Sequence, residues 1–409
     1  MITIGKPYVK REVGKSFLCS DIKDEKRDRT YVIWYSVDDQ YSFALSADRA
    51  DAFLLVAFMI AMKSHQDIKV EAPVSPRLLF NLENTIQPIF TRIIPNGKHV
   101  HISAENTNLP IFNAKGVGCG CSLGVDSMSS FLKHMSKDVP EEYHVTHLAL
   151  FNSCQFGYLD QEETEKIFAN AVEQLSPFSK EVNMPIVAVN TNLNELYLDS
   201  GFVTASSRFI PSTISCVLAL QRLWGKYVFA SSYSVTDFCI SQIDHSHAEA
   251  AFVPLLSTES TEIILSNPAM NRVEKTEYIS KSPLTPKYLD VCWAEQQANG
   301  IAKNRKWIEG KTKRNCGWCD KCLRTLFTLE LLGCSLHDYC ETFELRQYYS
   351  HRAEFIQQVC ENKDSNVMYN EIYDLMGKKN FPLPLSLKLK LRIKKSLIFR
   401  AYRRLRRSR

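Results

Sequence analysis

The segment Lys115-Gly-Val-Gly-Cys-Gly-Cys121, with its continuation Ser122-Leu-Gly-Val-Asp-Ser127, is the strongest indication of the fold. The first part is short and made of small and apolar residues, which predicts a buried strand. The second part holds Ser and Gly, and a helix is predicted from Ser127 to Met135. A strand that turns directly into a helix points backbone N–H groups and the positive helix end at one spot, which suits a phosphate. The alternative is an ordinary turn in which Ser127 caps the helix.

Downstream of this stretch, short apolar segments alternate with longer helical patterns. The predicted strands and helices are, in chain order, Val145–Phe151, a helix over 161–175, Pro185–Asn190, a helix over 211–223 and Lys226–Ala230. Strand, helix and strand at this spacing predict an α/β fold with a doubly wound, mostly parallel sheet and helices on both of its faces.

The flanking regions lack this alternation. Residues 1–110 combine strand patterns at Thr30–Val37 and His99–Ser103 with a helical pattern over Ala47–Met62, so we expect a small α+β accessory domain. The expected organisation is therefore an accessory domain (1–110), a central α/β domain with a cysteine knuckle (111–335), a helical segment (336–380) and a basic tail (381–409).

The cysteines indicate a metal site. Cys316, Cys319 and Cys322 follow Cys-x2-Cys-x2-Cys spacing, and Cys292 is the candidate fourth ligand. Four thiolates suit a closed, structural, tetrahedral zinc site. Iron–sulfur ligation is an alternative, and Cys334 or Cys340 could replace Cys292.

The charge is divided unevenly along the chain. Residues 388–409 hold 11 basic residues and no acidic one, so the net charge of +5 for 409 residues becomes −6 without them. Apolar residues recur every fourth position from Leu389 to Leu405, which suits an amphipathic helix. Such a tail could bind an anionic membrane surface or RNA, or pack on the body. The segment Met1–Arg11 has no apolar core of a secretory signal, so we expect a cytoplasmic protein, peripheral at the membrane if the tail binds there.

The segment Ser122-Leu-Gly-Val-Asp-Ser127 resembles the Ser-Gly-Gly-X-Asp-Ser loop of the PP-loop ATP pyrophosphatase superfamily, with Leu123 in place of the second Gly. Together with the later cysteine triplet, it is similar to the 7-cyano-7-deazaguanine synthase family, which ends its catalytic domain with a zinc knuckle. Ser207–Pro211, Ala230–Ser234 and Asn271–Glu277 fit that family more loosely. The resemblance covers about 114–333 and implies a Rossmann-like fold.

The resemblance also implies a reaction and its site. ATP and Mg²⁺ would bind over six residues, namely Ser122, Leu123, Gly124, Val125, Asp126 and Ser127. A small-molecule carboxylate or amide would be adenylated with release of pyrophosphate, and ammonia or an amine would then displace AMP. Lys275 and Arg208 would stabilise the leaving pyrophosphate, unless they are solvated surface charges. A homodimer is compatible with this scheme.

Two other functions stay open at this stage. Leu123 favours a weakened PP-loop protein that binds a nucleotide or nucleic acid without cleaving ATP. A tRNA-modifying sulfur transferase would instead depend on Cys121 or Cys154. Asp237, His245 and His247 lie in a polar loop, where a metal-binding role competes with ordinary turn roles.

Overall fold

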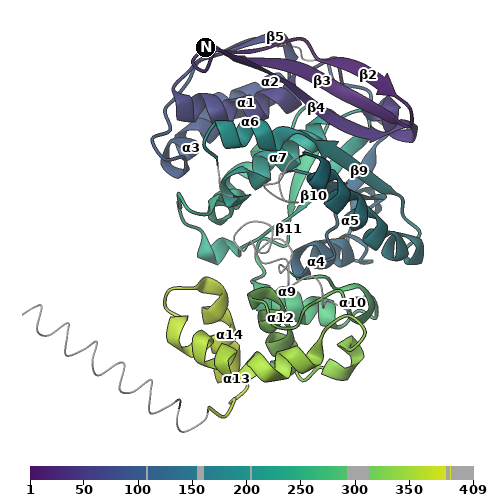
Figure 1. Ribbon diagram of the computed structural model, residues 1–409, viewed down its shortest axis with the longest axis vertical. Coiled ribbons are helices and arrows are strands. Elements are labelled where there is room, and N and C mark those ends of the chain that lie inside the picture. Colours follow the sequence, from purple (N-terminus) through teal and green to yellow (C-terminus); the bar gives the residue numbers. More distant parts are fainter. Residues whose placement is uncertain (107–108, 154–160, 203–204, 293–312, 384–386, 388–409) are drawn as a thin grey trace, which may run out of the picture. The chain divides into compact units, whose positions relative to one another are not determined.

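The computed structural model describes residues 1–106, 109–153, 161–202, 205–292, 313–383 and 387, in two compact units (Figure 1). The first unit is Met1–Met270, and the second contains the described residues from Asn271 onward. The basic tail 388–409 and Cys154 lie outside the described residues, so tail binding to membrane or RNA stays a prediction. In the described part of the chain, no helix has the length and apolar character needed to cross a membrane.

One mixed, mostly parallel sheet organises the first unit (Figure 1). Its strands are β1 (Ile2–Ile4), β2 (Tyr8–Glu12), β3 (Lys15–Asp24), β4 (Arg29–Asp38), β5 (Ile68–Val74), β6 (Ile102–Asn106), β7 (Gly116–Gly120), β8 (His147–Phe151), β9 (Ile186–Thr191), β10 (Trp224–Ala230) and β11 (Glu262–Ser266). The order is β11-β10-β7-β8-β9-β4-β3-β1-β5-β6, with β2 paired to β3. Every pair from β11 to β9 is parallel, so the α/β class and the parallel arrangement of the four expected strands are confirmed.

The sheet continues across the expected boundary at residue 110. Strand β4 pairs antiparallel with β9, with Tyr35 opposite Thr191 and Ser36 opposite Asn190. Residues 1–106 and 109–270 thus share one sheet and one core, and the compact division falls between Met270 and Asn271 rather than at 110 or 335. Without the β4–β9 pairing, each of these strands would be an edge strand with unpaired backbone N–H and C=O groups. The pairing satisfies these groups and joins the two parts of the sheet.

Helices surround this sheet in the first unit. They are η1 (Asp39–Ala44), α1 (Asp51–Ser64), α2 (Pro76–Asn81), η2 (Leu82–Ile86), α3 (Gln87–Ile93), α4 (Val125–His134), η3 (Glu141–Tyr143), α5 (Gln161–Glu181), α6 (Leu193–Asp199), α7 (Ala205–Ala219), η4 (Val235–Asp237), η5 (His245–Ala248), α8 (Glu249–Phe252) and η6 (Val253–Leu256). The helix α7 begins before the expected start at Pro211, which lies inside the helix rather than in its first turn.

Helix α1 is apolar on all sides and almost entirely buried, as such helices are in large cores. It packs against α7, β1 and β5. Its first residue, Asp51, accepts hydrogen bonds from the Ser75 backbone N–H (2.7 Å) and the Gln221 side chain (2.9 Å). These bonds compensate the burial of the carboxylate. They connect the start of α1 with Ser75, just after β5, and with Gln221, just after α7.

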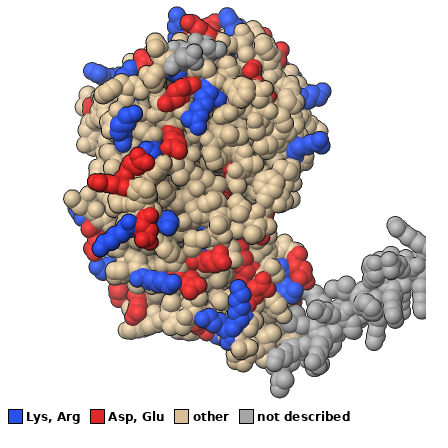
Figure 2. Space-filling view, turned by 180° about the vertical axis from the view of Figure 1, so that it is seen from behind, with Lys and Arg blue, Asp and Glu red and all other residues tan. Residues whose placement is uncertain are grey.

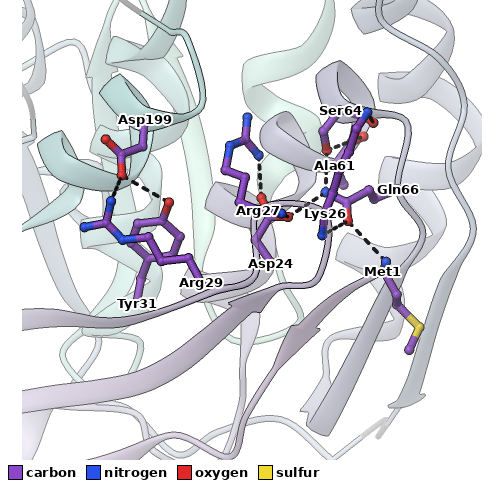
Figure 3. A network of polar contacts seen from close by, with 10 residues as sticks. All are labelled: Met1, Asp24, Lys26, Arg27, Arg29, Tyr31, Ala61, Ser64, Gln66 and Asp199. Atoms are coloured by element: carbon purple, nitrogen blue, oxygen red, sulfur yellow. Dashed lines mark hydrogen bonds and ion pairs between the residues drawn. The ribbon is translucent and has the colours of Figure 1, made fainter.

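A polar network at the β3–β4 turn makes a second connection of this kind (Figure 3). Asp24 accepts hydrogen bonds from Gln66 (3.0 Å) and from the Arg27 side chain. The Met1 ammonium donates to Gln66 at 3.1 Å. Arg29 pairs with Asp199 at the end of α6. The network ties the turn to α1 and to α6, which come from both sides of residue 110.

The second unit is helical around the cysteine cluster. Its described helices are α9 (Arg272–Ser280), α10 (Leu284–Tyr288), α12 (Asp320–Leu331), η8 (Leu336–Tyr339), α13 (Leu345–Asn362) and α14 (Val367–Lys378). Helix α12 contacts α9, α13 and α14. Positive and negative side chains lie interspersed on the face of the molecule seen in Figure 2.

Candidate metal centre and phosphate-binding loop

The strand order reverses at β7 and β10, which are hydrogen-bonded neighbours. From β7 the chain continues through β8 and β9 on one side, whereas β10 leads to β11 on the other. In open α/β sheets, ligands bind outside the carboxyl ends of the strands at such a reversal. The loop 121–124 follows β7 and Ser231 follows β10, so two segments singled out from the sequence meet at this edge.

Side-chain bonds connect the elements at this edge. The Asn267 side chain, just after β11, donates to Ser129 Oγ in α4 at 2.8 Å. Ser231 donates to the Asn267 carbonyl at 3.1 Å. The first turns of α4 are therefore held to the ends of β10 and β11.

Gly118 and Gly120 of β7 leave space for aromatic side chains of the neighbouring strand β10. A Cβ atom on Gly118 would lie 2.9 Å from the Trp224 ring, and one on Gly120 would lie 2.9 Å from the Tyr227 hydroxyl. Both aromatic side chains come from β10 and are fully buried. The small residues of this strand thus leave room for two large rings.

Helix α4 starts at Val125, and its N-cap residue is Gly124. No side chain makes a capping hydrogen bond there. Ser127 Oγ donates to the Gly124 carbonyl at 3.2 Å and lies 3.3 Å from Ser122 Oγ. The alternative in which Ser127 is the N-cap residue is wrong, because Ser127 lies within the first turn of α4. The first N–H groups of a helix have no partner inside the helix, so this end can accept an anion.

Leu123 adopts a backbone conformation that glycine favours. Its φ angle is +59°, in the left-handed region. A non-glycine residue pays about 1–2 kcal/mol for that conformation. The Leu123 side chain is only 3% exposed, and burying a leucine stabilises a fold by about 2 kcal/mol. A leucine at this position is therefore compatible with the turn, because its burial offsets the backbone cost.

The three residues proposed for catalysis lie on different elements. Asp126 is half-buried in the first turn of α4. Arg208 is fully buried in α7, where its guanidinium donates to the Phe202 carbonyl at 3.3 Å. Lys275 is 1% exposed on α9, in the second unit. The alternative that Arg208 and Lys275 are solvated surface charges is wrong for both.

Glu249 was not recognised from the sequence. Its carboxylate is 2% exposed and accepts hydrogen bonds from the backbone N–H groups of Ser232 (2.5 Å) and Tyr233 (3.2 Å). It thereby fixes the turn that follows β10, and only the fold brings it there. Tyr233 also stacks on His247, with ring centroids 3.7 Å apart.

The two loop histidines belong to no candidate metal group among the described residues. His245 is buried, and burial lowers its pKa. The His247 ring lies 3.2 Å from the Asp237 carbonyl. These contacts favour structural roles for both rings and for the exposed turn that ends at Asp237.

The structure brings together the four cysteines that the sequence analysis selected. The sulfur atoms of Cys292, Cys316, Cys319 and Cys322 all lie within 4.8 Å of one another. Cys316 Sγ and Cys322 Sγ are 3.9 Å apart, too far for a disulfide. Four thiolates at about 2.3 Å from a tetrahedral zinc ion are about 3.8 Å apart. The cluster could thus hold a metal ion such as zinc, with Cys292 rather than Cys334 or Cys340 as fourth ligand.

Asn315 holds the distant ligand in place, a role that the sequence did not reveal. Its buried side chain accepts a hydrogen bond from the Val291 N–H (2.8 Å) and donates to the carbonyls of Leu289 (2.8 Å) and Thr342 (3.1 Å). The segment that carries Cys292 is therefore fastened beside Cys316.

Gly317 makes the tight turn between the first two ligands of the triplet. Its φ is +76°, and a Cβ atom there would lie 2.2 Å from the Glu344 carbonyl oxygen. The Cys319 N–H donates to Cys316 Sγ at 3.3 Å. This turn ends where α12 begins, with Cys319 as its N-cap residue.

The thiols of the cluster share protons. Hydrogen bonds from Cys316 and then Cys322 lower the pKa of Cys292 to about 6, and the bond to Cys292 raises the pKa of Cys316 and of Cys322. A metal ion displaces these protons when it binds, since thiolates are the ligands. Cys121 differs, because burial raises its pKa to about 12. A protonated, buried thiol is a poor nucleophile.

Comparisons with family models, with curated proteins and with solved structures find no match to this chain.

Proposed function

We propose that the protein is an ATP-dependent enzyme of the PP-loop type, which adenylates a carboxylate or amide oxygen of a small molecule. The observation that carries the proposal is the loop 121–127. This loop follows β7, where the strand order reverses. It ends at the start of α4, which has no side-chain cap, and Leu123 adopts a left-handed backbone conformation that glycine favours.

Residues of this loop suit a triphosphate. The N–H groups at the start of α4 and the hydroxyls of Ser122 and Ser127 are donors for phosphate oxygens. Asp126 supplies a carboxylate in the same turn, and carboxylates are the protein ligands that Mg²⁺ prefers. The metal ion, when bound, neutralises charge on the phosphates.

The proposed reaction has two steps. The substrate oxygen attacks the α-phosphorus, the bond to the bridging oxygen breaks, and pyrophosphate leaves with its electron pair. Ammonia or an amine then attacks the activated carbon, loses a proton and expels AMP. Positioning and charge stabilisation are the main tasks of the protein in such transfers. The burial of Arg208 and of Lys275 favours structural roles for both side chains, within α7 and α9, over contact with the pyrophosphate.

The cysteine cluster has a structural part in this proposal. Its four thiols are mostly buried, and they connect α12 with the segment after α10. A closed four-thiolate site leaves no position for a substrate. We infer that the ion, zinc by preference, stabilises the second unit and takes no part in the chemistry.

The test is pyrophosphate release from ATP and Mg²⁺ in a screen of carboxylates and amides with ammonia. Asp126→Ala should abolish the release, and Asp138→Ala should not, because Asp138 is exposed beyond the end of α4. ATP binding that Asp126→Ala weakens, without AMP formation with any substrate, would instead indicate a nucleotide-binding protein. Activity that persists in Asp126→Ala would refute the role of the loop.

A further inference from the structure

The hydroxyl group of Tyr227 is a buried donor that the fold itself does not use. Tyr227 lies on β10 and is 1% exposed. Its hydroxyl makes no hydrogen bond to any residue that the structure describes. Buried tyrosine hydroxyls usually have a hydrogen-bond partner, because an unpaired buried donor costs about 1–3 kcal/mol. An unpaired donor of this kind is explained if a ligand supplies the acceptor.

The orientation of the Tyr227 ring brings this hydroxyl to the carboxyl edge of the sheet. Tyr227 is in register with Gly118 of β7, and its hydroxyl reaches Gly120, the last residue of that strand. The ring of Phe151, the last residue of β8, stacks on the Tyr227 ring with a centroid distance of 5.7 Å. The donor therefore lies where β7 passes into the loop 121–127.

There is space for a ligand atom beside this hydroxyl. Among the described residues beyond the chain neighbours of Gly120, the only atoms within 4 Å of a Cβ placed on Gly120 are the hydroxyl oxygen (2.9 Å) and Cζ (3.9 Å) of Tyr227. At Gly118, by contrast, ring atoms of both Trp224 and Tyr227 lie within 3.0 Å of such a Cβ. Gly120 is also half-buried rather than buried. The space at Gly120 is thus bordered by a single hydrogen-bond donor.

The Tyr227 hydroxyl keeps its proton at neutral pH. Burial raises the pKa of Tyr227, and the nearby thiols of Cys119, Cys216 and Cys121 raise it further. A protonated hydroxyl can donate a hydrogen bond. The oxygen atoms of a phosphate group are strong acceptors, and the start of α4, directly after the same loop, suits an anion. A phosphoryl oxygen is therefore the partner that this donor fits.

Other buried polar atoms at the same edge also have no partner among the residues described. They are Asn152 Oδ1, directly after β8, and Ser266 Oγ, at the end of β11. Asn152 is 1% exposed and Ser266 is 3% exposed. Because β8, β10 and β11 run in the same direction, these atoms lie at the edge that Tyr227 reaches. Unpaired polar groups at several strand ends favour a polar ligand there.

We propose that the Tyr227 hydroxyl donates a hydrogen bond to a phosphoryl oxygen of the nucleotide that the loop 121–127 binds, and that the space at Gly120 admits this oxygen. The inference rests on the nucleotide-binding role of the loop proposed above. Tyr227 is a binding residue in this scheme, since it holds the phosphate at the loop and transfers no proton.

Tyr227→Phe tests the proposal, because it removes the hydroxyl and keeps the ring. The full-length parent and variant are compared by calorimetric titration with ATP and Mg²⁺ and by urea unfolding. Tyr227→Phe should bind ATP at least about tenfold more weakly, the effect of losing a hydrogen bond to a charged group. Its unfolding midpoint should equal or exceed that of the parent, because the removed hydroxyl has no partner among the described residues.

Tyr348→Phe is the matched control. Tyr348 is also fully buried, but its hydroxyl donates to Glu330 at 2.5 Å. This variant should have a lower unfolding midpoint than the parent and should bind ATP with parental affinity. A loss of stability in Tyr227→Phe like that in Tyr348→Phe would show a structural role for Tyr227 and would overturn the proposal.

Gly120→Ala tests the space independently. The added Cβ would fill it and lie 2.9 Å from the Tyr227 hydroxyl oxygen, so both ATP affinity and the unfolding midpoint should fall. Combining Gly120→Ala with Tyr227→Phe removes that oxygen and leaves Cζ at 3.9 Å, an ordinary contact. Stability should then recover, whereas ATP affinity should stay low. Parental ATP affinity in Gly120→Ala would show that the space is not part of the site.

The same titrations separate this inference from the adenylation proposal. If Asp126→Ala weakens ATP binding and Tyr227→Phe does not, the loop binds the nucleotide without Tyr227, and the present inference alone is refuted. If the parent protein does not bind ATP, both proposals are refuted.

Discussion

Gly317→Ala is the sharpest test of the metal centre. The new Cβ would lie 2.2 Å from the Glu344 carbonyl oxygen, and the φ of +76° would disfavour any side chain. The obstacle is a backbone atom, and Glu344 is itself held, since its N–H donates to the Asn315 carbonyl at 3.0 Å. The turn must therefore open by about 1 Å, which separates Cys316 from Cys319.

The magnitude follows from two costs. The left-handed conformation costs alanine about 1 kcal/mol, and overpacking costs a further 1–3 kcal/mol, roughly. Gly333→Ala is the matched control, because its φ is +82° and nothing lies within 4 Å of its added Cβ. It pays the first cost alone. Zinc affinity in Gly317→Ala should thus be lower than in Gly333→Ala by about 5- to 150-fold.

The assay is competition for zinc with a chromophoric chelator, together with the zinc content of the purified proteins. If Gly317→Ala and Gly333→Ala bind zinc with affinities within about twofold of each other, below the smallest effect that the clash implies, the turn does not position the ligands and the reasoning is refuted.

Four further predictions follow from the same structure. Burial raises the pKa of Asp24, but hydrogen bonds from Gln66 and Arg27 outweigh it, so the pKa in the folded state lies below its usual value. The stabilisation from the ionised Asp24 is therefore present above the unfolded pKa of about 4 and is lost as the pH falls through the lower folded value. Below a pH of about 4, urea midpoints should fall more steeply in the parent protein than in Asp24→Asn. Leu123→Gly should relieve the left-handed strain but remove a buried side chain, for a net loss of about 1–3 kcal/mol in denaturant titrations; a gain in stability would contradict the offset described above. Asn315→Leu should cost about 2–5 kcal/mol and weaken zinc binding, because it leaves backbone groups near Cys292 unpaired, whereas parental zinc affinity would show that Asn315 positions nothing. Truncation after Leu385 should reduce sedimentation with anionic liposomes if the basic tail binds membranes, and equal sedimentation would exclude that role.

Local sequence patterns predicted most of the second half of the first unit. The strands β7 to β10 were expected because short apolar runs between helical patterns reflect burial on both faces, which acts residue by residue. The cysteine triplet was recognisable for a similar reason, since its ligands are separated by only two residues. Cys292 was correctly chosen as the fourth member of the cysteine cluster, although 23 residues separate it from Cys316.

Other features depended on contacts between residues far apart in the chain. The spacing of Gly118 and Gly120 indicated a small-residue strand, but their purpose became evident only with Trp224 and Tyr227 of the neighbouring strand. Strand β11 escaped notice, because Glu262–Ser266 is short and follows an irregular segment. Glu249 had no recognisable signal, because its partners lie 17 and 16 residues earlier and are backbone groups.

The sequence alone established the α/β class, the loop after the central strand and the composition of the metal cluster, because each is encoded by residues close together or by a distinctive residue type. The union of residues 1–106 with the parallel sheet, the left-handed backbone at Leu123 and the clamp of Asn315 on the Cys292 segment emerged only in three dimensions. Edge-strand pairing, backbone conformation and long-range hydrogen bonding are set by which surfaces the folded chain buries together. Local sequence patterns do not contain this information.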